Sequence, residues 1–166
     1  MNACASVAML VASLLLAGAA HAQPIELDGI ELSRDVPCLG KDVNISGHAN
    51  KISLTGNCGA VEVYGTDHEV SLETASALEV SGINNTVTAT SVGRLEVDTS
   101  QNRVRTAILG HGQTAIVEVS GAEHELELVF DGPAQLSLDG IDNRLKWGGD
   151  EPALSSSGIG HKIDRQ

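Results

Sequence analysis

Aromatic residues are nearly missing from this sequence: its 166 residues include one Tyr, one Phe and one Trp. Proteins that bind single-stranded nucleic acid commonly stack the bases on aromatic rings, and this chain has few to offer. Positive charge is scarce as well, because 10 Lys and Arg stand against 22 Asp and Glu, for a net charge of −12. A surface of that sign repels nucleic acid and anionic bilayers. We therefore expect no nucleic-acid partner.

No Lys or Arg precedes Arg34, and residues 1–22 are almost wholly apolar. This segment ends in Ala20-His21-Ala22, the pattern of small residues that precedes a signal-peptidase site. We predict a signal peptide over 1–22, which leaves a secreted or periplasmic protein with no membrane insertion. A retained transmembrane helix is the alternative, but the apolar run is shorter than the roughly 20 residues that a span needs. Since the usual positive start of a signal peptide is missing, either the α-amino group supplies the charge or translation starts upstream.

Helical periodicity is also missing after residue 22, whereas 18 Gly and alternating Val, Ile and Leu favour an all-β chain. A twelve-residue template recurs six times, as apolar-x-apolar-x-Gly-x-x-Asn/His-x-apolar-x-apolar. Residues 117–128, VEVSGAEHELEL, follow it fully, and residues 155–163 are a seventh, partial copy. Thr99 replaces the glycine in one copy. The other full copies are residues 43–54, 61–72, 78–89, 95–106 and 136–147.

The glycine positions of successive copies are 18, 17, 17, 22, 19 and 18 residues apart, with Thr99 counted in its place. A period near 18 that tolerates insertions is typical of a β-solenoid, in which each coil buries its apolar side chains against its neighbours. We predict a single-domain parallel β-helix with about six to seven coils of 17–22 residues. The irregular spacing favours a right-handed β-helix over the left-handed hexapeptide type. A β-sandwich is the alternative, since strands at intervals of about 8 to 12 residues also suit it.

Two cysteines, Cys38 and Cys58, follow the predicted signal peptide, and in an oxidising compartment they are expected to pair. Their separation is close to one coil, which places them on adjacent turns. Closing a loop of this size stabilises the fold by about 3 kcal/mol in the chain-entropy model. We predict a lead-in or cap over residues 23–37, solenoid repeats over 38–147, and a C-terminal cap with the partial repeat over 148–166.

The Asn/His position of the template falls on the inward phase of the strands, at a corner where the glycine allows the chain to bend. Stacked coils would align these side chains in one row, where they can hydrogen-bond one another and the bent backbone. We call this row the Asn/His ladder and assign it a structural role. A zinc site is disfavoured, because asparagines separate the histidines and replace them poorly as zinc ligands. The ladder comprises Asn50, His68, Asn85, Asn102, His124, Asn143 and His161.

The repeated Gly-x-x-Asn/His-x-apolar units resemble the bacterial domain of unknown function family 3060. VEVYGTDHEVSL and LEVSGINNTVTA, which follow ISLTGNCGA, carry the resemblance, and it covers about residues 38–147. The family implies a secreted β-helical module without an established activity, so it implies no catalytic or binding residues. Thr99 and the insert at residues 109–113 depart from its pattern.

One outward position of the template is acidic in four successive copies, Glu62, Glu79, Glu96 and Glu118, which we call the glutamate column. Stacked carboxylates repel one another unless a cation or solvent screens them. Weak binding of a divalent cation such as calcium is one interpretation, and a solvated acidic face is the other. The corresponding position of the second strand has mixed signs: Lys51, Glu69, Thr86, Arg103, Glu125, Arg144 and Lys162.

Enzymatic activity is not indicated, although parallel β-helices include polysaccharide-active enzymes. Glycoside hydrolysis needs two carboxylates across a cleft, whereas Glu96 and Asp98 share one outer face and the coils are too short to build cleft walls. We therefore predict a non-catalytic structural or protein-binding module of the cell envelope with an envelope protein as partner. A weak cation-binding surface and, less well supported, a polysaccharide-active enzyme are the alternatives.

Overall fold

The computed structural model describes residues 23–166, so the predicted signal peptide lies outside the described residues. This part of the chain contains fourteen strands and no helix. The strands are β1 (Ile25–Ile30), β2 (Ser33–Pro37), β3 (Val43–His48), β4 (Lys51–Thr66), β5 (Glu69–Ile83), β6 (Thr86–Val92), β7 (Leu95–Val97), β8 (Arg103–Leu109), β9 (Ala115–Val119), β10 (Glu125–Asp131), β11 (Ala134–Ile141), β12 (Arg144–Gly149), β13 (Ala153–Ile159) and β14 (Lys162–Arg165).

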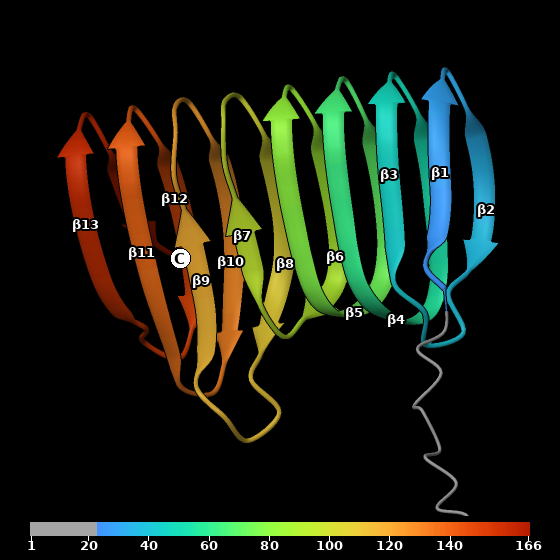
Figure 1. Ribbon diagram of the computed structural model, residues 1–166. Coiled ribbons are helices and arrows are strands. Elements are labelled where there is room, and N and C mark those ends of the chain that lie inside the picture. Colours follow the sequence, from blue (N-terminus) through green and yellow to red (C-terminus); the bar gives the residue numbers. More distant parts are fainter. Residues whose placement is uncertain (1–22) are drawn as a thin grey trace, which may run out of the picture.

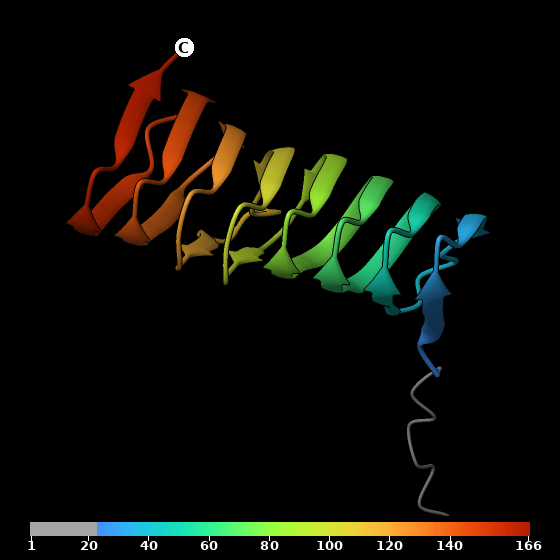
Figure 2. The ribbon, with the colours of Figure 1, turned by 90° about the horizontal axis from the view of Figure 1, so that it is seen from above.

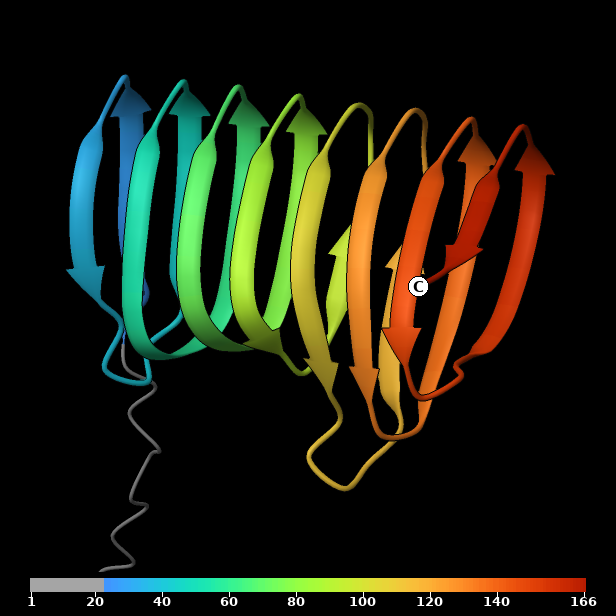
Figure 3. The same ribbon diagram turned by 180° about the vertical axis from the view of Figure 1, so that it is seen from behind.

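The strands wind into a β-solenoid in which every pairing is parallel and joins one coil to the next (Figure 1). Each coil supplies one strand segment to each of two faces. The first face, toward the viewer in Figure 1, contains β1, β3, β7, β9, β11, β13 and the C-terminal parts of β4 and β5. The second face, toward the viewer in Figure 3, contains β2, β6, β8, β10, β12, β14 and the N-terminal parts of β4 and β5.

The solenoid is right-handed, as predicted: first-face strands run upward and second-face strands downward as the chain advances from β1 toward β13 (Figures 1 and 3). Figure 2 shows the coils following one another in a single row. The β-helix prediction is confirmed, and the β-sandwich alternative is wrong. The number of coils is about eight, rather than six to seven.

The additional coil lies at the N-terminus, where a lead-in was predicted. β1 pairs in register with β3, which places Gly29 beside Gly47, and β2 pairs with β4. Leu32 occupies the position that Asn50 fills in the next coil, because Leu32 and Asn50 both precede the first residue of their second-face strands. The first coil therefore lacks the Asn or His residue by which the other copies of the template are recognised. For this reason the coil was not predicted from the sequence.

The core lies between the two faces and is built from the inward residues of each strand. In β4, for example, Ile52, Leu54, Val61 and Val63 are buried while their neighbours Lys51 and Glu62 are exposed. Equivalent residues stack coil upon coil, so that Val61 lies between Val43 and Leu78. Because a lone coil cannot cover its own apolar side chains, each coil depends on its neighbours for burial.

The glycines of the template turn the chain at the end of the first face, and we call them the glycine column. They all have positive φ angles, such as +106° at Gly82. The column consists of Gly47, Gly65, Gly82, Gly121, Gly140 and Gly158. A Cβ atom at Gly82 would overlap the carbonyl oxygen of Gly65 in the coil before it. Thr99 occupies the same place with a φ of +73°, and β7 already ends at Val97. The threonine is therefore accommodated by ending the strand before the bend.

The predicted disulfide between Cys38 and Cys58 is present. The Cα atoms are 4.9 Å apart, and both cysteines are buried. The backbone N–H of Cys38 donates to the carbonyl of Thr55 at 3.0 Å, which places the cysteines on adjacent coils. The bond therefore joins the N-terminal end of the solenoid covalently to the following coil.

Candidate functional site

The Asn/His ladder lies at the inner corner that joins the first face to the second. Asn85 shows the arrangement: its Oδ1 accepts the backbone N–H of His68 at 3.0 Å. Its Nδ2 donates to the carbonyls of Ser81 at 3.2 Å and Gly65 at 3.1 Å. Asn50, Asn102 and Asn143 bond in the same way. The ladder side chains thus bond the backbone of two coils, and in residues 23–166 no hydrogen bond joins two ladder side chains, contrary to one part of the prediction.

Both ring nitrogens of His68 and of His124 are occupied by backbone groups. Nδ1 accepts a backbone N–H at 3.1 Å in each case, from Asn50 and from Asn102. The ring proton of the neutral imidazole must then be on Nε2, which donates to the carbonyl of Tyr64 at 3.2 Å and of Ser120 at 2.9 Å. Burial lowers the pKa of both imidazoles. These nitrogens are structural groups, and a metal would have to displace backbone hydrogen bonds to reach them.

Acidification between pH 7 and pH 5 is therefore expected to destabilise the protein through His68 and His124. The pKa of each imidazole is lower in the folded state than in the unfolded state, so the unfolded chain takes up protons first as the pH falls. The stabilising contribution of the two histidines is therefore fully present above the unfolded pKa of about 6.5 and is lost below it. The slope is up to about 1.4 kcal/mol per pH unit for each histidine. Urea unfolding across this pH range should show a flatter dependence for His68→Asn/His124→Asn. His161→Asn, at the exposed last coil, is the control; an unchanged slope in the double variant would contradict the assignment.

The glutamate column is in register on the first face, where Glu62 pairs with Glu79, Glu79 with Glu96, and Glu96 with Glu118. Partial burial, followed by repulsion from Glu96 and Glu62, raises the pKa of the Glu79 carboxyl. Arg94, which the sequence reasoning overlooked, reaches along the column: its guanidinium lies 2.6 Å from Glu118 and 3.4 Å from Glu96. The uncompensated charge is therefore concentrated at the Glu62–Glu79 end.

Metal-binding clusters are not found in residues 23–166: no three His, Cys, Asp or Glu side chains converge in a way that could hold an ion. Within residues 23–166, the two histidines outside the ladder are surface residues. His48 contacts the hydroxyl of Thr66 at 2.8 Å, and His111 is exposed in the insert between β8 and β9.

A row of outward residues with positive φ runs along the bend beside the ladder. In each coil the residue before the ladder position adopts this conformation, with φ between 53° and 60° for the non-glycine members. Side chains of neighbouring coils bond one another here: Asn84 donates to Asp67 at 2.5 Å, and Gln101 donates to Glu123 at 2.9 Å. The row presents carboxylate and amide groups to solvent. It consists of Glu31, Ala49, Asp67, Asn84, Gln101, Glu123, Asp142 and Gly160.

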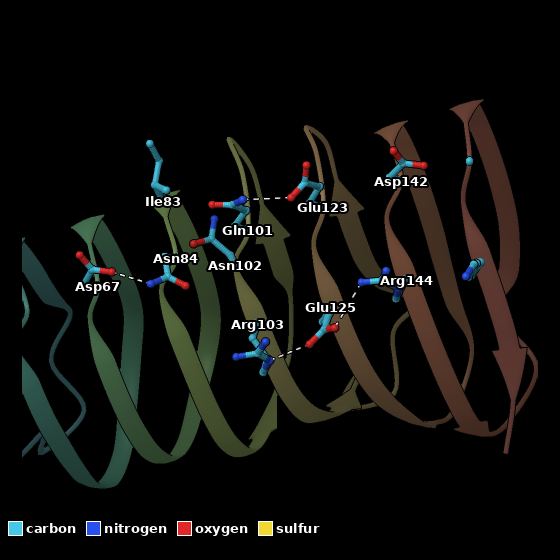
Figure 4. Close-up of a pocket in the computed structure, with 12 residues that line it drawn as sticks. Asp67, Ile83, Asn84, Gln101, Asn102, Arg103, Glu123, Glu125, Asp142 and Arg144 are labelled. Carbon is cyan, nitrogen blue, oxygen red and sulfur yellow. Dashed lines mark hydrogen bonds and ion pairs between the residues drawn. The ribbon is translucent and has the colours of Figure 1, made fainter.

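A groove of about 900 Å³ separates this row from the first residues of the second-face strands (Figure 4). We call it the edge groove. Its opposite wall is a chain of ion pairs, in which Arg103 donates to Glu125 at 2.8 Å and Arg144 approaches the same carboxylate at 3.4 Å. The hydrogen bond from Arg103 lowers the pKa of Glu125. Asn102, a ladder residue, lines the groove between the two walls.

The two faces differ in charge. The first face presents the glutamate column, whereas the C-terminal half of the second face presents five cations: Arg103, Arg105, Arg144, Lys146 and Lys162. Three carboxylates, Glu125, Glu127 and Asp164, lie in the same two columns, and Arg105 is paired with Glu127 at 2.5 Å. The sequence reasoning treated one column at a time and found mixed signs. The adjoining column, two residues further along each strand, adds Arg105 and Lys146 to the same surface.

Comparison with known proteins bears on the repeat region. A family model described as "Protein of unknown function (DUF3060)" matches residues 45–102. The predicted resemblance is confirmed there. The match is shorter than the predicted 38–147, and the DUF3060 segment ends at the coil in which Thr99 replaces glycine. No curated protein and no solved structure matches the chain. Residues 23–166 also contain no helix that is long and apolar enough to cross a membrane.

Proposed function

We propose that the protein is a secreted or periplasmic, non-catalytic binding module of the bacterial cell envelope, and that it binds a protein partner in the edge groove. The proposal rests on the two walls that face each other across this groove. One wall presents carboxylates and amides, and the other presents arginines and a glutamate. Fixed rows of both charge signs can select a partner with the complementary pattern. The ladder beneath the groove holds the backbone of adjacent coils together, so that the rows keep their spacing.

The Cys38–Cys58 disulfide supports the extracytoplasmic part of the proposal, because such bonds persist in oxidising compartments. The DUF3060 match supports no particular activity, and the absence of catalysis remains a prediction. Release of product from a panel of acidic polysaccharides would favour the alternative of a polysaccharide-active enzyme.

Partner capture with matched arginine variants tests the groove. The immobilised protein is expected to retain a specific protein from a bacterial envelope extract, and Arg144→Ala, which removes a groove cation, should reduce that retention at least tenfold. Arg94→Ala removes the same charge from the opposite face and should leave retention unchanged. Equal retention by both variants would show that the edge groove is not the binding surface.

A second candidate function is weak binding of calcium at the glutamate column. Its support is the in-register stacking of Glu62, Glu79 and Glu96 and the raised pKa of Glu79. Carboxylate oxygens are the ligands that calcium prefers. Arg94 opposes it, because the guanidinium already neutralises part of the column.

Thermal unfolding distinguishes a cation site from a solvated acidic face. If calcium binds, millimolar Ca²⁺ should raise the Tm of the wild type above that in Mg²⁺ or chelator, and Glu79→Gln/Glu96→Gln should remove the difference. Without calcium, Glu79→Gln should itself raise the Tm at pH 7, because it removes a carboxylate whose folded-state pKa is raised. That gain should shrink once the pH falls below the folded pKa of Glu79, and it should vanish below the unfolded value of about 4.3. A Tm independent of calcium would leave the column as a solvated face.

A further inference from the structure

In the part of the chain that the structure describes, residues 23–166, the strands at the two ends of the solenoid have no neighbour on one side. At the N-terminal end these are β1 and β2, and at the C-terminal end they are β13 and β14. Unpaired strand edges are templates for pairing with other chains, and solenoids need terminal coils that prevent it. Several apolar side chains at these ends are only partly covered, among them Ile25, Leu27 and Val36 in the first coil and Leu154 in the last.

A second copy of this chain presents, at its opposite end, strands that would continue this parallel pairing. If the coil-to-coil register continued across the junction, β13 of one copy would pair with β1 of the next, with Gly158 beside Gly29. β14 would pair with β2 in the same way, with Lys162 beside Ser33. Such a contact joins two different surfaces and does not close, so repetition would produce a filament.

Two arginines occupy inward positions of the terminal coils that are apolar in neighbouring coils. Arg34 pairs with Ile52 and is thus in line with Val70, Val87 and the buried residues beyond. Arg165 pairs with Trp147, and its guanidinium lies over the indole ring at 4.7 Å from the centroid. Both arginines are exposed, Arg34 in the first coil and Arg165 in the last coil of the described residues. We propose that Arg34 and Arg165 block head-to-tail stacking of copies of this protein.

The blocking effect follows from what each arginine would meet in the stacked arrangement. Continuing the register places Arg34 against Ile163 and Arg165 against Val36, on the core side of the junction. Both guanidinium groups would lose water there while facing an apolar side chain, which is unfavourable. Arg165 lies 3.8 Å from Glu151 of its own chain, a distance longer than that of a charge-assisted hydrogen bond. On the outer side, Asp164 would face Asp35, and like charges directly opposite destabilise a strand pair.

The ladder is also interrupted at this junction. Leu32 occupies its position in the first coil, so it offers no side-chain oxygen or nitrogen to the backbone N–H of His161 in a preceding copy. Within the chain, the N–H of each position from Leu32 to His124 is accepted by the next ladder residue, as Asn50 accepts the N–H of Leu32 at 2.9 Å. Among the described residues, the bond is missing at the last step, where Nδ1 of His161 has no partner. A head-to-tail junction between two copies would thus lack the ladder bond that joins coils within the chain.

Removing the two inward charges tests the proposal. The full chain is produced in bacteria with its own N-terminal segment and purified with the disulfide intact. By light scattering after size exclusion, the wild type should be monomeric, whereas Arg34→Val/Arg165→Val should form concentration-dependent oligomers with at least a doubling of mean mass. Arg103→Val/Arg144→Val removes the same charge from outward positions and should stay monomeric.

Cross-linking separates end-to-end stacking from non-specific aggregation. Adding Ser33→Cys and Lys162→Cys to the double variant should give a ladder of covalent multimers on oxidation, because these positions face each other only across a head-to-tail junction. The proposal is overturned if Arg34→Val/Arg165→Val remains monomeric with an unchanged circular dichroism spectrum, if its oligomers lack this cross-link, or if the wild type already stacks.

Discussion

Replacing Gly82 by alanine is expected to lower the free energy of unfolding by about 3 kcal/mol or more, because backbone strain and a steric clash add together. The φ angle of +106° lies where side chains other than hydrogen are strongly disfavoured. The new Cβ would also overlap the carbonyl oxygen of Gly65, which belongs to the backbone of the adjacent coil and cannot rotate away. Urea unfolding followed by circular dichroism measures the loss.

Gly56→Ala is the matched control for Gly82→Ala. Gly56 also has a positive φ, of +78°, but a Cβ atom there would meet no heavy atom within 4 Å. Its cost is limited to the left-handed conformation, about 1–2 kcal/mol. Equal losses in the two variants would mean that the close approach of coils at the glycine column does not determine stability.

Asn85→Ala is expected to cost about 3 kcal/mol, because one buried side chain bonds three backbone groups. The substitution leaves the N–H of His68 without its acceptor and removes the donor to the carbonyls of Gly65 and Ser81. An unpaired buried polar group costs about 1–3 kcal/mol. The loss is measured as a change in the urea midpoint at constant m-value.

Asn85→His provides the comparison, since histidine fills the same ladder position at His68 and His124. It should preserve an acceptor for the backbone N–H and a donor for the carbonyl four residues earlier. We expect it to cost less than half as much as Asn85→Ala at pH 8. If both variants lose the same stability, the hydrogen bonds of the Asn85 side chain do not account for its contribution to stability.

Much of the fold could be predicted because each coil repeats one pattern of side chains. The glycine column fixes where the chain bends, and the alternation on either side fixes which side chains face inward. The inward phase of His124 followed from counting residues. The pairing of Cys38 with Cys58 followed from their spacing of about one coil and from the predicted oxidising compartment. The first coil was missed because Leu32 takes the place of a ladder residue, although its backbone follows the same path.

The surface features could not be read in the same way, because they depend on contacts between columns. Arg94 precedes the first apolar position of its template copy, and only the folded arrangement brings its guanidinium to Glu118 in the next coil. The edge groove likewise needs two rows, one from the bend and one from the second face, whose separation is set by the corner between them. A single column of the template shows the charge of each side chain, but it does not show which columns lie on the same surface.

The coil that contains Thr99 has a consequence for how the molecule opens. β7 is three residues long and joins its neighbours through three residue pairs on each side, whereas β4 and β5 pair along both faces. The same coil continues into the insert at residues 109–113 before β9 begins. Local unfolding in native proteins starts where cooperative contacts are fewest. Amide exchange through partial opening should therefore divide the solenoid here into two separately protected blocks, with the disulfide in the first.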